Sequence, residues 1–481
     1  MNENSYIPES FIKKVKEIIP EHLNLDDFIR SCRQPLRRSI RVNTLKISCA
    51  AFIDKVKCKG WQLSPIPWCT EGYWLERPKE EEAILQLGNT EEHLAGLFYV
   101  QEASSMLPPF AMLTNGSLDA ETVLDVASAP GSKTTQLAAY MNNNGFIVAN
   151  ELSASRVKVL YSNIERCGVK NIGLTHFDGR VFGDYMPESF DAILLDAPCS
   201  GEGTIRKDPD ALKNWNQAHL DEVAVLQKEL IISAFKALKP NGVLIYSTCT
   251  LNLEENQQVC QHLKTTYPEL VELESLQNMF TDASKATTPE GFLHIWPQIF
   301  DSEGFFAARI RKTGSLEDNR PTKKKLGKFP FEPAKEKQTN ALATYFNNQF
   351  GLNLTDELGK VMIRDNEYWL FPHAALPHIE KVKYQRVGIK LADEHKKGFR
   401  THHQVAITFG KHFIKNIYQL NADQAVNYFK GQDVQLNDLV PDTGEVLLML
   451  NNAPIGLGKW QKRKIKNTLP RELVKNSRVI Q

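Results

Sequence analysis

Short apolar segments alternate with helical patterns between residues 120 and 265, and this alternation restricts the fold more than any other feature of the sequence. The apolar segments are rich in β-branched residues, several end on a polar or acidic residue, and they comprise 122–128, 145–151, 171–178, 190–196 and 242–249. Helical patterns such as "SASRVKVLYSNIERCG" lie between them. The alternation predicts an α/β fold, a doubly wound parallel sheet that binds ligands beyond the carboxyl ends of its strands.

The chain has 481 residues, which is too long for one ordinary domain, and its composition and hydrophobic periodicity change several times along its length. We expect six segments: an α+β module at 1–110, the α/β domain at 111–312, a basic linker at 313–329, a small mixed unit at 330–384, a compact β-barrel-like unit at 385–468 and a basic tail at 469–481.

Charge is distributed unevenly although the net charge is only +1. Residues 311–481 carry 29 lysines and arginines against 17 acidic residues, whereas residues 1–310 carry 29 against 40. An anionic partner is therefore expected at the C-terminal third, the alternative being a merely solvated basic surface. The start of the chain has no secretory pattern and no apolar run is long enough for a bilayer, so we expect a cytoplasmic protein without membrane contact.

The eight cysteines form no CxxC pair and none lies at zinc spacing from a histidine, so neither a disulfide framework nor a metal site is expected. His402 and His403 are adjacent, and in the strand predicted there they would face opposite ways and could not share a metal. Cys199 in "DAPCSG" and Cys249 in "YSTCT" differ from the rest, because they follow neighbouring strands in polar turns. That placement suits reactive thiolates, although cysteines are more often small buried hydrophobes.

Acidic residues end several of the predicted strands. The first predicted strand leads into the segment "DVASAPGSK" (125–133), in which small residues precede a helix whose amides can bind an anionic group. This segment lacks the residue spacing of a P-loop and of a dinucleotide-binding fold. Glu151 falls where such folds commonly hold a ribose, and Asp178 can accept from an adenine amino group. Helix capping explains either acid alone, but less readily both acids together with Asp125.

The motifs "DVASAPGSK", "NE", "FD", "DAPCSG" and "STCT", in this order, resemble those of the RNA cytosine-5 methyltransferases of the NOP/SUN family. The similarity extends over residues 35–312 and includes the flanking pieces "RVNTLK", "YVQEASSM", "RKDPD" and "HIWPQIFDSEGFFAARIRK". One departure is Ser132, where many relatives have a glycine, and we expect only a local change in the turn.

This resemblance implies S-adenosylmethionine as the cofactor, with Glu151 on its ribose, Asp178 near its adenine and Asp196 beside it. The loop along which it would lie comprises Ala127, Ser128, Ala129, Pro130, Gly131, Ser132 and Lys133. The resemblance further implies that residues 111–312 form the methyltransferase domain and that residues 1–110 help to bind RNA.

The resemblance also implies a division of labour between the two thiols. Cys249 would add to carbon 6 of cytosine, and Cys199 would assist resolution of the covalent intermediate. Asp196 is placed to hydrogen-bond the pyrimidine N3 and amino group, and Lys133 to orient Asp196 or the nucleophile. DNA cytosine-5 methyltransferases instead use a cysteine in a Pro-Cys motif, which by analogy would make Cys199 the nucleophile.

The C-terminal sequence resembles a PUA-type RNA-binding module. A core with this tail and length resembles the ribosomal branch of the family, which implies 16S rRNA in assembled 30S subunits as the substrate, 5-methylcytosine as the product and a monomeric enzyme. The alternatives are another RNA such as tRNA or 23S rRNA, a ribosome assembly factor without catalysis, and a small-molecule methyltransferase.

Overall fold

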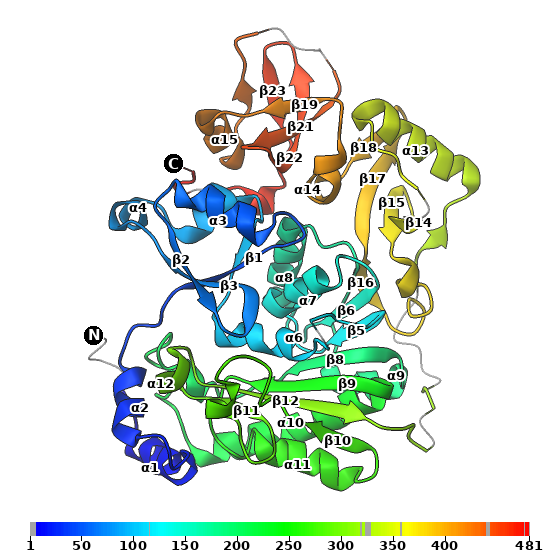
Figure 1. Ribbon diagram of the computed structural model, residues 1–481. Helices are drawn as coiled ribbons and strands as arrows, with labels where there is room; N and C mark the ends of the chain where they lie inside the picture. Colours follow the sequence, from blue (N-terminus) through cyan, green and yellow to red (C-terminus); the bar gives the residue numbers. More distant parts are fainter. Residues whose placement is uncertain are drawn as a thin grey trace.

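The computed structural model describes most of the chain, and Figure 1 shows how its parts are arranged. The described residues are 6–114, 116–317, 320–322, 329–355, 358–438, 443–475 and 477–480. A large sheet occupies the centre, the N-terminal elements lie along one side of it, and most elements from residue 336 onward lie above it or to its right in this view (Figure 1). Part of the predicted linker, residues 318–319 and 323–328, lies outside the described residues.

Nine strands of the described chain form the central sheet, and five of them are the strands that the sequence predicts. These five are β5 Thr122–Asp125, β6 Phe146–Asn150, β7 Ile172–Thr175, β8 Phe190–Asp196 and β9 Leu238–Thr248. They run parallel in the order β7-β6-β5-β8-β9, so the chain changes its direction of winding between β5 and β8. The doubly wound α/β fold is thereby confirmed, and the change of direction marks where such sheets bind ligands.

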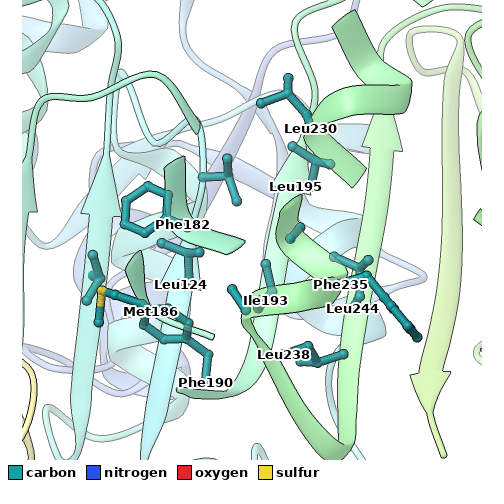
Figure 2. Close-up of a cluster of buried hydrophobic side chains, with 14 of the residues drawn as sticks. Leu124, Phe182, Met186, Phe190, Ile193, Leu195, Leu230, Phe235, Leu238 and Leu244 are labelled. Atoms are coloured by element: carbon teal, nitrogen blue, oxygen red, sulfur yellow. The ribbon is translucent and has the colours of Figure 1, made fainter. Parts of the chain in front are cut away.

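Both faces of this sheet are buried, because successive side chains of a strand point to opposite faces. In β8, Ile193 and Leu195 pack in one apolar cluster whereas Leu194 packs in the other. Figure 2 shows the first cluster, in which Phe182 and Phe235 from the covering helices meet the strand residues. The helices around the sheet are α7 Ser132–Tyr140, α8 Ala154–Cys167, α9 Phe182–Tyr185, α10 Gln217–Ala237 and α11 Gln257–Thr266.

Three further strands extend the sheet beyond β9, in a region for which no strands were predicted. They are β10 Val271–Glu274, β11 Leu293–Ile295 and β12 Phe305–Lys312, with α12 Pro297–Phe300 before the last. β12 runs antiparallel to β9, and Phe306 pairs with Thr248. The loop that precedes β12 therefore lies at the same sheet edge as the carboxyl end of β9.

The N-terminal part is an α+β unit with two outlying helices. Its sheet has the order β2-β3-β1-β4, and its elements are β1 Ser39–Val42, β2 Gln62–Ile66, β3 Cys69–Glu76, β4 Phe98–Val100, α3 Cys49–Lys57, α4 Lys79–Ile84, α5 Glu91–Leu94 and α6 Leu107–Ala111. The helices α1 Glu9–Ile18 and α2 Leu25–Cys32 pack instead against the central domain, where Phe28 contacts Trp296.

The first C-terminal unit contains helix α13 Glu336–Phe350 and a sheet in the order β13-β14-β15-β17-β18. Its strands are β13 Glu332–Pro333, β14 Lys360–Arg364, β15 Glu367–Phe371, β17 Ile389–His395 and β18 Gly398–Thr401. Since β17 pairs with β15, this sheet crosses the boundary expected between residues 384 and 385.

A short strand of this unit leaves it and joins the central sheet. β16 Tyr384–Val387 pairs antiparallel with β7, with Tyr384 opposite Thr175 and Val387 opposite Gly173. An edge strand exposes unpaired backbone amides and carbonyls. The C-terminal part of the chain therefore covers one edge of the central sheet.

The last unit has the sheet order β19-β21-β22-β23-β20. Its elements are β19 Ile417–Gln419, β20 Val434–Gln435, β21 Glu445–Leu450, β22 Ala453–Gln461, β23 Lys464–Asn467 and α15 Ala422–Phe429.

The prediction of a strand around His402 and His403 is wrong. Residues His403–Phe409 form helix α14, and the Nδ1 atom of His402 caps this helix by accepting from the Gln404 amide. Among the described residues, no helix is both long and apolar enough to cross a bilayer.

Candidate active site

The residues singled out at the strand ends meet at one edge of the central sheet. The loops after β5, β8 and β9 lie side by side there, because these strands are parallel neighbours. The edge coincides with the change of winding direction between β5 and β8, where a doubly wound sheet leaves a crevice.

The two cysteines are in direct contact. β8 and β9 pair in register with Asp196 opposite Ser247, so Cys199 and Cys249 follow a few residues later on adjacent loops. Their Sγ atoms are 3.2 Å apart, which is a thiol hydrogen bond, and both side chains are half-buried. The loops after two neighbouring strands thus bring the two thiols together.

Lys133 and Asp196 form an ion pair beside the thiols. The Nζ atom of Lys133 lies 2.6 Å from Asp196 Oδ2 and donates to Ser105 Oγ at 2.9 Å, while Asp196 Oδ1 accepts from Ser247 Oγ at 2.8 Å. Burial lowers the pKa of Lys133, but Asp196 outweighs it and holds that pKa above its ordinary value. The lysine therefore stays positively charged in the crevice.

The environments of the two thiols differ. The hydrogen bond from Cys199, assisted by the charge of Lys133, lowers the pKa of Cys249 in spite of its burial. The hydrogen bond to Cys249 and burial raise the pKa of Cys199, and the nearby Glu255 raises it further. A negative charge shared by the pair thus resides on Cys249, the sulfur that the lysine stabilises.

The loop after β5 has the geometry of a ligand cradle. Gly131 has a φ of 106°, a left-handed conformation that favours glycine, and Ser132 begins α7. The loop is held to β6 by the hydrogen bond from the Ser128 amide to the Asn150 carbonyl, at 2.8 Å. Behind it, burial raises the pKa of Asp125 to about 7, and Asp125 accepts from Thr134 Oγ1 at 2.7 Å.

The remaining loop residues lie along the same turn. They are Ala127, which is partly exposed, Ala129, whose carbonyl accepts from Arg156, and Pro130, whose carbonyl accepts from Tyr99 and Asn163.

Glu151 and Asp178 lie at the ends of the next two strands in different states. Glu151 is only 3% exposed, its Oε1 accepts from the Ser153 amide at 2.8 Å, and its Oε2 has no hydrogen-bond partner. Arg156 Nη1 is 3.4 Å from that oxygen. Asp178 is one-third exposed, and both of its oxygens accept from Arg180, whose hydrogen bonds lower the pKa of Asp178. Glu151 thus keeps one oxygen without a hydrogen bond beside Arg156, whereas both oxygens of Asp178 already accept from Arg180.

A buried polar network that the sequence did not reveal supports the Cys249 loop. Glu202 is 1% exposed, and its Oε2 accepts from Thr250 Oγ1, the amides of Leu251 and Asn252, and Asn252 Nδ2. Its Oε1 accepts from Trp215 Nε1 at 2.6 Å. The only sequence signal was the acid next to the cysteine motif in "CSGEGT".

Two more acids, the buried Glu303 and the partly exposed Glu102, border the crevice and were also missed from the sequence. The amide of Glu303 donates to Glu102 Oε1 at 3.3 Å, and Glu303 Oε1 has no hydrogen-bond partner. Burial, reinforced by Glu102, raises the pKa of Glu303 to about 8, and Cys249 and Lys133 lie close enough to contribute. Within the described ranges, no group of three or more His, Cys, Asp or Glu side chains is arranged to hold a metal ion.

Comparisons with known proteins agree along the whole chain. Four family profiles match: "16S rRNA methyltransferase RsmB/F" at residues 113–311, the N-terminal domain of 16S rRNA methyltransferase RsmF at 7–103, the pre-PUA domain of ribosomal RNA small subunit methyltransferase F at 331–409 and the methyltransferase RsmF PUA domain at 415–475.

Individual relatives match over nearly their full length. The ribosomal RNA small subunit methyltransferases F of Vibrio campbellii and Vibrio atlanticus are 54% and 55% identical to this chain, and each alignment covers 99% of both proteins. Among solved structures, a methyltransferase homolog protein from Pyrococcus horikoshii is 33% identical with a TM-score of 0.51, over 64% of this chain and 100% of that one.

Proposed function

Because the chain belongs to the ribosomal RNA small subunit methyltransferase F family, we propose that it methylates carbon 5 of one cytosine in 16S rRNA. The product is 5-methylcytosine and the methyl donor is S-adenosylmethionine. The proposed substrate is the assembled 30S subunit in the cytoplasm, and the enzyme acts as a monomer.

The chemistry requires a nucleophile, since carbon 5 of cytosine is too poor in electrons to attack a methyl group unaided. Addition of the Cys249 thiolate to carbon 6 makes carbon 5 electron-rich, so that one difficult step becomes several easier ones. After methylation the carbon 5 proton must leave and Cys249 must be eliminated. Cys199, 3.2 Å from the leaving sulfur, is placed to assist that elimination.

The observation that carries this proposal is the asymmetry of the thiol pair. Cys249 has a lowered pKa and feels the charge of Lys133, whereas Cys199 has a raised pKa and faces Glu255. A nucleophilic cysteine needs a stabilised thiolate. The asymmetry favours Cys249 over Cys199, the nucleophile suggested by analogy with the DNA enzymes.

Asp196 and Lys133 have supporting roles in this proposal. A carboxylate has about four acceptor positions, and Asp196 uses one oxygen for Lys133 and the other for Ser247, so lone pairs remain for a cytosine amino group. Protonated N3 would be a second partner. Lys133 fixes the direction of the carboxylate and keeps a positive charge near Cys249.

The residues of the first loop fit S-adenosylmethionine, which supplies an electrophilic methyl group when it is bound. The Oε2 of buried Glu151 accepts no hydrogen bond although Arg156 lies beside it, so it is a suitable acceptor for a ribose hydroxyl. A Cβ at Gly131 would approach the buried Leu160 Cδ1 to 3.1 Å, so the glycine lets the loop pack closely against α8. The further cofactor contacts are proposed for residues 127–133, Asp178 and Asp196, and Asp178 would have to share its oxygens with Arg180.

RNA affinity is proposed to come mainly from the C-terminal units, where basic residues are in excess. The β22–β23 hairpin exposes three cations, Lys462 and Arg463 in its turn and Lys466 in β23. Because β17 and β18 share a sheet with β15, we propose that residues 330–409 form one unit and that the PUA-like unit begins after it.

The decisive experiment uses the purified protein with labelled S-adenosylmethionine and 30S subunits. Wild type, Cys249→Ala and Cys199→Ala are assayed for methyl transfer and, on a denaturing gel, for a protein–RNA adduct. We expect no adduct with Cys249→Ala and an accumulating adduct with Cys199→Ala, because the first lacks the attacking sulfur and the second the assisting one.

Cys58→Ala is the matched control, since Cys58 is an exposed thiol after α3. It should methylate like wild type. An adduct with Cys249→Ala but not with Cys199→Ala would exchange the two roles. If the wild-type protein binds 30S subunits but transfers no methyl group, the result would favour a role as a ribosome assembly factor. Methylation of tRNA or 23S rRNA alone would refute 16S rRNA as the substrate.

A further inference from the structure

The two thiols of the active site can also react with each other. Their Sγ atoms are 3.2 Å apart, and a disulfide needs about 2 Å. We propose that Cys249 is a site of reversible oxidation by hydroperoxides, and that Cys199 is the resolving thiol that closes a disulfide with it.

The first step is a two-electron oxidation of Cys249. The thiolate attacks the terminal oxygen of the hydroperoxide, the oxygen–oxygen bond breaks, and a sulfenic acid forms. The leaving hydroxide or alkoxide takes a proton from solvent and departs as water or an alcohol. Oxidation of this kind follows thiolate character and access. Cys249 has both, because its side chain is half-buried at the crevice and Lys133 stabilises its charge.

The second step joins the two sulfurs. The Cys199 sulfur attacks the sulfur of the sulfenic acid, the sulfur–oxygen bond breaks, and the hydroxyl leaves as water with the Cys199 proton. A closure of roughly 1 Å is needed. Both cysteines lie in loops beyond β8 and β9, outside any helix or strand, so the strands themselves need not move.

The other cysteines are poor competitors for this reaction. All eight lie in the described part of the chain, and the contact between Cys199 and Cys249 is the one hydrogen bond between two sulfurs found there. Burial raises the pKa of Cys32 and of Cys69 to about 12, so both remain protonated thiols. Cys58 is exposed but has no sulfur partner in the described chain, so the intramolecular disulfide should form between Cys199 and Cys249.

The disulfide would remove the proposed nucleophile and halt RNA methylation until a dithiol reduces it. It would also protect Cys249 from the irreversible sulfinic and sulfonic acids. This consequence rests on the proposed function, whereas the oxidation itself does not.

The test exposes the full chain to hydrogen peroxide, blocks remaining thiols with iodoacetamide and maps the peptides by mass spectrometry. We expect a peptide pair joined through Cys199 and Cys249, with the loss of two hydrogen atoms and full reversal by dithiothreitol. The mass readout needs no RNA, so it stays informative even if the protein methylates nothing. Methyl transfer measured on the same samples should fall and recover in step with the disulfide.

Two variants sharpen the result. In Cys199→Ser the sulfenic acid of Cys249 should persist, react with a 1,3-diketone probe and pass to sulfinic acid with excess peroxide. Cys58→Ser, a change at an exposed thiol, should form the disulfide as wild type does. The proposal is overturned if wild type keeps both thiols reduced, if Cys249 passes to sulfinic acid without bridging, or if Cys58→Ser abolishes the bridge.

Discussion

Replacing Glu202 by glutamine tests whether the buried network behind Cys249 stabilises the fold as its geometry implies. The carboxylate accepts five hydrogen bonds, four on Oε2 and one on Oε1. Glutamine has the same shape but only one acceptor oxygen. If the glutamine oxygen accepts the four hydrogen bonds now made to Oε2, the glutamine amide nitrogen faces the Trp215 indole N–H. Two hydrogen-bond donors then point at each other in a buried site without an acceptor.

The cost follows from these contacts. An unsatisfied buried donor costs about 1–3 kcal/mol, and four bonds that change from charged to neutral acceptors each weaken by about 0.5 kcal/mol or more. We therefore expect Glu202→Gln to lower the free energy of unfolding by about 3–5 kcal/mol. Methyl transfer should fall as well, because Thr250, Leu251 and Asn252 directly follow Cys249.

The assay is urea unfolding followed by circular dichroism, with Glu229→Gln as the matched control. Glu229 is half-exposed and pairs with Arg180 at the surface, at 2.6 Å. Its replacement should cost no more than about 1 kcal/mol. Equal losses in the two variants would refute the reasoning, since they would mean that the five contacts of Glu202 contribute no more than one surface ion pair.

Three other predictions concern the crevice. Lys133→Met should raise the pKa of Cys249 and shift the rate of its alkylation by iodoacetamide toward higher pH, and an unshifted profile would contradict the role given to the lysine. Glu151→Gln should weaken S-adenosylmethionine binding about tenfold in calorimetry while leaving the melting temperature unchanged, because one charge-assisted hydrogen bond is lost. The pKa of Asp125 is about 7 in the folded protein and 3.8 for the free group, so between these pH values the folded state binds more protons than the unfolded state. The free energy of unfolding of the wild type therefore falls as pH rises through this window. The free energy of unfolding of Asp125→Asn, relative to that of wild type, should therefore increase by at most about 1.4 kcal/mol per pH unit across that window. A difference in urea unfolding that stays constant from pH 4 to 7 would refute this prediction.

The central domain was predictable because its signals are local. Buried parallel strands are continuous apolar runs, and the residues that end them, such as Glu151 and Asp196, must collect at one sheet edge. The contact between Cys199 and Cys249 follows from the same geometry. The resemblance to RNA cytosine-5 methyltransferases, confirmed by the full-length relatives, rested on these same motifs.

The failures have a common physical cause, which is that long-range pairing leaves little trace in local sequence. Residues 384–387 join a strand of the catalytic sheet, and no local pattern shows this. Glu202 and Glu303 are acids that resemble surface residues until their partners are known. His402 and His403 were assigned to a strand because the apolar run after them is β-branched, but a side-chain cap starts a helix there.

The pairing of β16 with β7 has a consequence for how the chain acquires its structure during synthesis. β7 is complete at residue 175, but its partner emerges only roughly 200 residues later, so its outer edge stays open while most of the protein is still being made. Open edges invite pairing with other chains. A nascent chain that stalls before residue 384 would therefore have a nearly complete catalytic domain with one unpaired sheet edge. It would depend on chaperones to prevent aggregation until β16 has been synthesised.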